Sequence, residues 1–365
     1  MSEVARLEVA DLRNLDAVVL EPAPGAMTVV TGHNGAGKTT LLEAIGYAST
    51  LRSFRGGQKE ALVRNGATRA IVRADLADGD RRALVEIEID PSRRDRVQLN
   101  RQRLARPEDL LEALRVTVFT PDDLALVKSG PELRRDYLDT VLETARPRLA
   151  LVRRAVDRAL RQRNTLLRQA GSRLTAEVAA TLDVWDAQLA KAGDQLVDAR
   201  RRLVDALAPP AAAAFGRLTR LVEPLELTYR PSYDPPLLDA LAAARPDDLR
   251  RGTTTIGPQR DDLLVACGGL DARTRLSQGR QRSAALALRL AAHEVVTDKA
   301  AARPVLLLDD AFSELDRATA TALLDELGRL GAGQAILTTA GPVPDGIDAA
   351  LVLQLADGRL TPVPR

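Results

Sequence analysis

The chain has 365 residues, of which 45% are hydrophobic and 28% charged, so it is long enough to form two globular domains. A net charge of +2 excludes a uniformly polycationic protein, and a single cysteine, Cys267, excludes an internal disulfide and fits a reducing compartment. No apolar run approaches the roughly 20 residues that span a bilayer, and the first residues lack the pattern of a signal peptide. We therefore expect a cytoplasmic protein without a membrane partner.

Two strands are predicted near the N-terminus, over residues 7–12 and 17–20, with a turn between them. A β-rich run at residues 27–31 comes next, and residues 41–45 read as the start of a helix. The loop between that run and that helix is Gly32-His33-Asn34-Gly35-Ala36-Gly37-Lys38-Thr39-Thr40. It matches the pattern G-x-x-x-x-G-K-[ST] in the required order of strand, loop and helix, which a chance glycine-rich turn would not explain. The sequence therefore predicts a nucleoside triphosphate site.

The residue types in this loop suit a triphosphate. Glycines allow successive backbone N–H groups to turn inward around phosphate oxygens, and the following helix directs its positive end toward the same anion. Lys38 would reach the β- and γ-phosphates, and the Thr39 hydroxyl would bind Mg²⁺. The next loop, residues 51–57, carries Arg52 and Arg55, which could contact phosphate or remain solvated.

Residues 70–106 read as β structure with an arginine-rich edge. Within it, residues 93–106 contain six arginines and one acid, Asp95. The candidates for DNA contact in this segment are Arg93, Arg94, Arg96, Arg101 and Arg103. Such an edge could hold a phosphate backbone, or its charges could serve only to prevent aggregation through an edge strand.

From residue 121 the pattern changes from strands to helices. Helices are predicted over residues 131–144 and 149–167, each with an apolar face. Residues 146–173 contain nine arginines and one acid, Asp157. The candidates for DNA contact here are expected to lie opposite the apolar face, and they are Arg153, Arg154, Arg158 and Arg161. A solvated helix face is the other explanation of this charge.

A longer helix is predicted over residues 174–208. At a rise of 1.5 Å per residue it is on the order of 50 Å long, which is too short for the long antiparallel arms of the chromosome-structuring ATPases. The pair Pro209-Pro210 is expected to end this helix, and later prolines, including Pro246, are expected to interrupt the segment that follows.

The C-terminal third returns to alternating strands and helices. Residues 276–291 form a Ser/Gly turn that runs into a helix and so offer a second anion-binding helix N-terminus. Residues 304–310 read as a buried strand that ends in Asp309 and Asp310, the place where a P-loop ATPase holds Mg²⁺. A helix at residues 318–330, one more strand and a terminal hairpin are predicted to complete the sheet.

About 270 residues separate the phosphate loop from Asp309. Compact P-loop kinases and GTPases place these two features much closer, so a further domain is expected between them. We predict a helical subdomain, residues 121–249, inserted between the two parts of one ATPase head, residues 1–120 and 250–365.

The turn Leu276-Ser277-Gln278-Gly279 resembles the signature of ABC-type ATPases, and residues 313–316 resemble the D-loop of that superfamily. The expected fold is therefore α/β. It consists of an ABC-type P-loop ATPase head built from N- and C-terminal segments, with an inserted, mainly helical subdomain that lacks a long coiled coil.

Within that superfamily the chain resembles the RecF family of bacterial recombinational-repair ATPases over nearly its full length. The resemblance rests on stretches spread along the chain, at residues 32–40, 121–124, 134–139, 163–167, 185–190, 257–263, 277–282 and 307–310. The chain departs from the family pattern at Gln259, where histidine is usual, and at Arg280, where glutamine is usual. Leu12 and Leu15 replace aromatic residues, and Ala340 stands where transporter ATPases carry a histidine.

The resemblance implies a mechanism. Residues 32–40 would hold ATP, Lys38 would neutralise the β- and γ-oxygens, and Thr39 with Asp309 would hold Mg²⁺. Asp310 would orient or deprotonate the attacking water. Ser277 and Gly279 of a second subunit would close on the γ-phosphate, so that ATP joins two copies head to head.

The family role that the resemblance implies is ATP-dependent DNA binding in replication, recombinational repair and the response to DNA damage. The ATP-bound homodimer would clamp DNA at gaps and junctions and help to load recombinase on single strands, with the RecR and RecO proteins as partners. Slow, DNA-dependent ATP hydrolysis would drive release. Aromatic residues make up only 2% of the chain, which favours duplex DNA over single strands as the main target.

Two alternatives share the same motifs. The nucleotide-binding subunit of a transporter would carry a shorter helical insert and usually the histidine that Ala340 replaces. A DNA-binding clamp that senses ATP without turning it over differs only in the rate of hydrolysis.

Overall fold

The structure, a computed structural model, describes residues 3–171, 173–234, 236–300, 303–313, 315–331 and 333–363. The chain forms two compact units. The first consists of Met1–Leu124, Arg217–Arg220 and Ala285–Arg365, and the second of Ala125–Gly216 and Leu221–Ala284. Residues 250–284, assigned to the head from the sequence, therefore cluster with the helical insert, because a strand of this segment pairs with a strand of the insert. Glu314 of the predicted D-loop lies outside the described residues.

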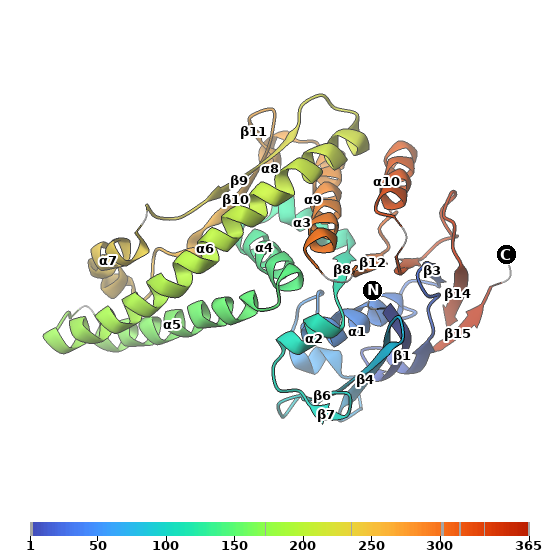
Figure 1. The fold of residues 1–365 in the computed structure, drawn as a ribbon, viewed down its shortest axis with the longest axis horizontal. Coiled ribbons are helices and arrows are strands. Elements are labelled where there is room, and N and C mark those ends of the chain that lie inside the picture. Colours follow the sequence, from blue (N-terminus) through green and yellow to red (C-terminus); the bar gives the residue numbers. More distant parts are fainter. Residues whose placement is uncertain are drawn as a thin grey trace. The chain divides into compact units, whose positions relative to one another are not determined.

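The first unit contains two six-stranded sheets (Figure 1). One is antiparallel, with the strand order β2-β1-β4-β5-β6-β7. Its strands are β1 (Glu3–Leu12), β2 (Leu15–Leu20), β4 (Ala70–Asp78), β5 (Arg81–Ile89), β6 (Arg96–Leu99) and β7 (Gln102–Arg103). Along β4, buried residues alternate with more exposed ones, as expected of a sheet with one face in the core. The predicted N-terminal hairpin is confirmed, since Leu12 pairs with Leu15.

The second sheet of this unit is built from both ends of the chain. Its order is β15-β14-β3-β13-β12-β8, and its neighbouring strands run parallel except in the hairpin of β14 and β15. Its strands are β3 (Met27–Thr31), β8 (Val116–Phe119), β12 (Val305–Asp309), β13 (Ala335–Thr339), β14 (Leu351–Ala356) and β15 (Arg359–Pro362). Every residue of β12 and β13 is buried, which is typical of a parallel sheet covered on both faces. The predicted head made from N- and C-terminal segments is thus confirmed.

Helix α1 (Lys38–Thr50) lies between the two sheets. It contacts β1 and β4 of the antiparallel sheet and β8, β12 and β13 of the parallel sheet. Of its 13 residues, 11 are buried, and Leu41, Leu42 and Ile45 belong to one core cluster with residues of both sheets. Other helices of this unit are η1 (Lys59–Leu62), α2 (Glu108–Ala113), η2 (Pro121–Asp123) and α10 (Arg317–Arg329). The position of α1 is therefore fixed from both sides.

The second unit is mainly helical. Its elements include α3 (Leu124–Lys128), α4 (Pro131–Ala145), α5 (Leu149–Ala170), α6 (Ala176–Thr219), α7 (Leu237–Arg251), η3 (Pro258–Arg260) and α8 (Ala272–Arg275), and α9 (Gln278–Lys299) begins here. A small antiparallel sheet has the order β11-β10-β9, with β9 (Leu225–Arg230), β10 (Asp262–Cys267) and β11 (Leu270–Asp271). Helices α5 and α6 run side by side as a hairpin (Figure 1). In the part of the chain that the structure describes, this hairpin does not extend into a long coiled coil, and the predicted fold class is confirmed.

Helix α6 is longer than the sequence indicates. The predicted stop at Pro209-Pro210 is wrong, since both prolines lie inside the helix, and Pro246 likewise lies inside α7. A proline removes one helical hydrogen bond, but burial outweighs this cost here. The buried face of α6 keeps its helical period through the prolines, with at most 4% exposure at Leu203, Leu207, Ala211 and Phe215. Neither α6 nor another described helix is long and apolar enough to cross a membrane.

Buried ion pairs join the helices of the second unit. The guanidinium group of Arg163, on α5, is fully buried and donates to Asp186 of α6 and to Asp248 of α7, each at 2.6 Å. Arg200 of α6 donates two hydrogen bonds, at 2.7 and 2.8 Å, to Asp139 of α4. The positive charge counted along residues 146–173 is therefore partly balanced in the fold, because acids of α6 and α7 reach Arg163.

Candidate nucleotide-binding site

The phosphate-binding loop, residues 32–40, joins β3 to α1, as predicted. Two glycines of the loop lie so close to neighbouring residues that a side chain at either position would clash. A Cβ atom on Gly32 would lie 2.5 Å from the carbonyl oxygen of Leu355 in β14, and one on Gly37 would lie 2.4 Å from Cδ2 of Leu15. Gly37 also has a φ of 107°, in the region that favours glycine. The loop backbone is thus packed between the C-terminal hairpin and the N-terminal turn.

Lys38 is the first residue of α1 and is only 8% exposed. Its Nζ donates hydrogen bonds to the carbonyl oxygens of Gly32, at 2.8 Å, and His33, at 3.0 Å. Burial lowers the pKa of the ammonium group, and the nearby carboxylates of Asp310 and Asp309 oppose this shift. The ammonium is therefore held in the loop with little water around it, and a phosphate group would supply a further anionic partner.

Asp309 ends β12 and is only 6% exposed. Its Oδ1 accepts hydrogen bonds from the hydroxyl groups of Thr39, at 2.9 Å, and Thr338, at 2.7 Å. The pKa of this carboxyl group is raised, chiefly by burial and further by the negative charge of Asp310. The hydrogen bonds from the two hydroxyls and the positive charge of Arg55 lower it and offset part of this shift. Because the ionised Asp309 carboxylate is poorly solvated here, a cation bound beside it would stabilise the ionised form.

The donor set at this point fits a hard divalent cation such as Mg²⁺. The Thr39 hydroxyl and the Asp309 carboxylate offer oxygen atoms, the ligands that Mg²⁺ prefers. In nucleotide sites this ion is usually held by one or two protein groups together with phosphate oxygens and water. The described residues contain no cluster of three or more His, Cys, Asp or Glu side chains that could hold a metal by themselves. Thr39 and Asp309 would therefore hold the ion together with a bound nucleotide.

Asp310 follows in an uncommon backbone conformation, with a φ of 46°. Its N–H donates to the carbonyl oxygen of Thr338, at 3.1 Å, and its carbonyl oxygen accepts from the N–H and the hydroxyl of Ser313, at 3.0 and 2.7 Å. The side chain is partly exposed and close enough to Lys38 to raise the pKa of that ammonium. The turn thus holds a carboxylate that water can reach beside the phosphate loop.

The turn between β1 and β2 supports the loop, a role that sequence reasoning missed. Asn14 donates from Nδ2 to the carbonyl oxygen of Gly35, at 2.7 Å, and its Oδ1 accepts from the hydroxyl of Thr40, at 3.0 Å. One amide group therefore holds both the bend of the loop and the first turn of α1. The only signal in the sequence is the hairpin turn itself, which does not reveal what lies across from it.

Glu43, on α1, anchors the same turn. Its side chain is 1% exposed and accepts hydrogen bonds from Nε and Nη2 of Arg13, at 2.8 and 2.5 Å. Ser53 donates to this carboxylate at 2.5 Å, and Nη1 of Arg55 lies 3.6 Å from it. Arg55, which was predicted either to contact phosphate or to be solvated, therefore lies beside two acids of the site, Glu43 and Asp309.

The Ser/Gly turn before α9 belongs to the second unit. Ser277 and Gly279 are exposed, and a Cβ atom on Gly279 would have nothing within 4 Å. The carbonyl oxygen of Ser277 accepts from the N–H of Gln281 at 2.9 Å, and the buried Gln281 side chain donates to the carbonyl oxygen of Arg273 at 2.9 Å. The start of α9 is thus fixed while Ser277, Gly279 and Arg280 remain accessible.

The candidate DNA-binding arginines of the first unit lie at the β6–β7 edge of the antiparallel sheet and its preceding loop. All five are exposed, and no described carboxylate forms an ion pair with them: Arg93, Arg94, Arg96, Arg101 and Arg103. Asp95, the one acid among them, is engaged elsewhere, because it accepts from the Tyr47 hydroxyl at 2.7 Å and pairs with Lys59 at 2.5 Å. The excess of positive charge counted along residues 93–106 therefore remains at this edge of the folded protein, because no described carboxylate pairs with the five arginines.

The candidates on α5 differ from one another. Arg154, Arg158 and Arg161 are exposed. Arg153 instead pairs with three carboxylates of α4, those of Asp136, Asp139 and Glu143, at 3.1, 3.5 and 3.3 Å. Burial lowers the pKa of Arg153, but these carboxylates outweigh it and raise the pKa. The prediction that Arg153 faces away from the fold is wrong, because it ignored acids on the neighbouring helix.

The fold and the site define an ABC-type P-loop ATPase head. Its marks are a phosphate loop at the start of a helix between two sheets, an acid at the end of another strand of the same parallel sheet, and an inserted helical unit. The family described as RecF/RecN/SMC N terminal domain matches residues 3–342. The Smc head domain from Pyrococcus furiosus, at 17% identity, covers 100% of this chain and 96% of its own with a TM-score of 0.59, and so shares the fold.

Proteins that are more similar to this chain identify the family within this class. The DNA replication and repair protein RecF of Frankia alni is 45% identical over 333 residues, which are 86% of this chain and 87% of that protein. A solved structure of the recombination mediator protein RecF-ATP in the RecFOR pathway is 26% identical, with a TM-score of 0.90 over 100% of this chain and 98% of its own. The chain belongs to the RecF family.

Asn14→Ala is expected to weaken nucleotide binding by up to about thirtyfold, because it removes two hydrogen bonds, each worth roughly 1 kcal/mol, that hold the loop in its binding shape. Titration calorimetry with ATP and Mg²⁺ would measure the change. The control is Asp16→Ala in the same hairpin. Among the described residues its carboxylate pairs only with Arg64, away from the loop, so this change should leave affinity unchanged. Equal affinity of Asn14→Ala and wild type would contradict the assignment.

Asp309→Asn is expected to stabilise the nucleotide-free protein by on the order of 1 kcal/mol and to abolish Mg²⁺-dependent nucleotide binding. The amide oxygen can still accept from Thr39 and Thr338, but the poorly solvated charge is gone. Because the raised pKa penalises the ionised form, the gain should be largest at neutral pH and vanish in acid, where Asp309 is itself protonated. Scanning calorimetry from acidic to neutral pH measures it, with the exposed Asp80→Asn as control. A loss of stability at neutral pH would refute the argument.

Proposed function

We propose that this chain is an ATP-binding protein of DNA replication and repair that hydrolyses ATP slowly. The observation that carries the proposal is the meeting of Lys38 and Thr39, at the start of α1, with Asp309, at the end of β12. This arrangement supports the binding of a triphosphate together with a metal ion. A relative named as a DNA replication and repair protein, and a solved RecF-ATP structure, support the choice of process and nucleotide.

In the proposed mechanism Lys38 contacts the β- and γ-oxygens of ATP, and Thr39 and Asp309 hold Mg²⁺. The metal ion, when bound, neutralises negative charge on the phosphates. Asp310 is the proposed catalytic carboxylate, which orients the attacking water or accepts its proton, because it is partly exposed and lies beside Lys38. An aspartate reaches less far than the glutamate that most ABC ATPases carry here, which supports slow turnover.

A second copy of the chain would complete the site. Ser277 and Gly279 are accessible at the N-terminus of α9, where backbone N–H groups favour an anion. They are proposed to close on the γ-phosphate held by the other subunit, and Arg280 adds a positive charge to this turn. ATP would thus join two copies, and hydrolysis would separate them.

The proposed DNA contacts are exposed arginines of the β6–β7 edge and of α5. The set consists of Arg93, Arg94, Arg96, Arg101, Arg103, Arg154, Arg158 and Arg161. Arg153 is left out because carboxylates of α4 neutralise it. Contacts to phosphate carry no base sequence information, so duplex, gapped or junction DNA would be recognised by its shape, and single strands would bind more weakly.

In this proposal the ATP-bound dimer clamps DNA at gaps or junctions and helps to place recombinase on single strands. Hydrolysis then releases the DNA. The solved RecF-ATP structure is assigned to the RecFOR pathway, which supports the RecR and RecO proteins as partners.

Sedimentation velocity of the wild type, Asp310→Asn and Lys38→Ala with ATP and Mg²⁺, with and without gapped duplex DNA, tests the clamp. Wild type and Asp310→Asn are expected to dimerise and retain DNA, whereas Lys38→Ala should do neither. Phosphate release should fall at least hundredfold in Asp310→Asn, the usual size of a general-base contribution.

Two results would count against this proposal. A wild-type protein that stays monomeric and ignores DNA with ATP bound would remove the clamp and reopen the transporter alternative. Unchanged phosphate release in Asp310→Asn would remove Asp310 from the catalytic role, while leaving ATP binding in place.

The combined change of Arg96, Arg101 and Arg103 to alanine is expected to weaken DNA binding and to flatten its salt dependence. The slope of log K against log salt should shrink by about one for each phosphate group that the protein no longer binds. Fluorescence anisotropy with labelled gapped duplex at several salt concentrations measures it, with Arg359→Ala, exposed on β15, as the matched control. An unchanged slope would mean that this edge is charged only to prevent aggregation.

A further inference from the structure

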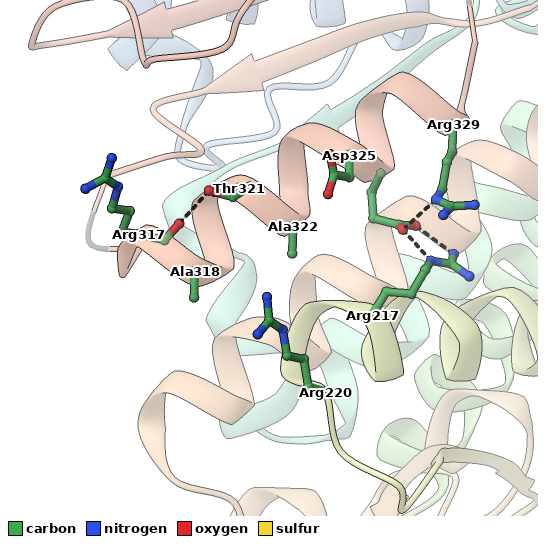
Figure 2. Close-up of a pocket in the computed structure, with 9 residues that line it drawn as sticks. Arg217, Arg220, Arg317, Ala318, Thr321, Ala322, Asp325 and Arg329 are labelled. Atoms are coloured by element: carbon green, nitrogen blue, oxygen red, sulfur yellow. Dashed lines mark hydrogen bonds and ion pairs between the residues drawn. The ribbon is translucent and has the colours of Figure 1, made fainter.

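The first unit contains a pocket away from the phosphate loop, between α10 and the last residues of α6 (Figure 2). Its volume is about 560 Å³, in the range of sites that accept several side chains or a small ligand. It is lined by residues of α10, by Arg217 of α6 and by Arg220, which directly follows that helix. Nothing in the nucleotide site or in the proposed DNA-binding surface uses it.

Small side chains form the middle of the α10 side of the pocket. Ala318 and Ala322 project from α10 toward the side on which Arg220 lies (Figure 2). The hydroxyl of Thr321 donates to the carbonyl oxygen of Arg317 at 2.9 Å, so this residue is already satisfied within its helix. These residues offer a small apolar surface between the charged side chains of the pocket.

Two of the arginines that line the pocket are engaged with one acid. Arg217 donates two hydrogen bonds to the carboxylate of Glu326, one of them at 2.7 Å, and Nε of Arg329 lies 3.6 Å from it. Glu326 is only 4% exposed, and its ion pairs with these two arginines balance its charge. These three residues form the fixed wall of the pocket.

The other two arginines remain available. Arg220 and Arg317 are exposed, and no described carboxylate forms an ion pair with either. They come from different elements, and in Figure 2 the Arg317 side chain extends away from Arg220. Asp325 is exposed at the same opening. Four arginines against Asp325 and Glu326 leave the pocket with an excess of positive charge.

We propose that this pocket binds an acidic segment of a protein partner. Spaced carboxylates of the segment reach Arg220 and Arg317, and an apolar side chain between them lies on Ala318 and Ala322. Because the Arg317 side chain extends away from Arg220, separate carboxylates along a peptide suit the two arginines better than one phosphate group does. A DNA backbone, with its dense charge, would meet the Asp325 carboxylate, whereas a peptide can place an uncharged or basic side chain there.

The test uses the full chain without nucleotide, because the proposal does not depend on ATP binding. A random peptide library is selected on the wild type and counter-selected on the Arg220→Glu, Arg317→Glu variant. The retained peptides are expected to be rich in aspartate and glutamate. One of them, labelled with fluorescein, should bind the wild type at least tenfold more tightly than the variant and lose affinity as salt is raised.

The control variant is Arg251→Glu, Arg359→Glu, which makes the same change of charge at exposed residues outside the pocket and should bind the peptide like wild type. Calorimetry checks that both variants are folded. The proposal is overturned if no peptide separates the wild type from the pocket variant, if the retained peptides are not acidic, or if the control weakens binding equally. It is also overturned if the pocket variant loses gapped duplex binding in parallel, since the pocket would then belong to the DNA surface.

Discussion

Burial of α1 is the constraint on which the nucleotide site depends. Because the helix lies between two sheets, the charged groups of its first turns must find partners inside the protein. Glu43 binds Arg13 and Ser53, and Lys38 binds carbonyl oxygens of the loop. An unpaired charge there would cost several kcal/mol. The pairing therefore holds the N-terminal turn, the loop and the segment after α1 in one arrangement before a ligand arrives.

The features of the site that could be predicted from the sequence have local signals. The glycine and lysine pattern, the strand before it and the helix after it lie within a few residues of one another, and so do the apolar run and Asp309. Their separation along the chain then predicts an inserted unit. Asn14 could not be found in this way, because its partners Gly35 and Thr40 lie 21 and 26 residues away.

The errors of sequence reasoning have a common physical cause, which is contact between elements that are distant in the chain. Burial along α6 overrides the local tendency of Pro209-Pro210 to end a helix. Carboxylates of α4 neutralise Arg153, which counting charges along α5 cannot reveal. Strand β8 has four residues at one edge of the parallel sheet, and only its pairing with β12 identifies it.

Because β3 lies between β13 and β14, the nucleotide site can form only late in the synthesis of the protein. The strand that leads into the phosphate loop has neighbours on both sides from the last part of the chain, and the Thr31 hydroxyl donates to the carbonyl oxygen of Leu353, 322 residues later. On the ribosome the sheet around the loop cannot close until β13 and β14 have been translated. We therefore expect a nascent chain to be unable to bind ATP, so that a chain that stops short of β14 cannot compete with the finished protein for nucleotide.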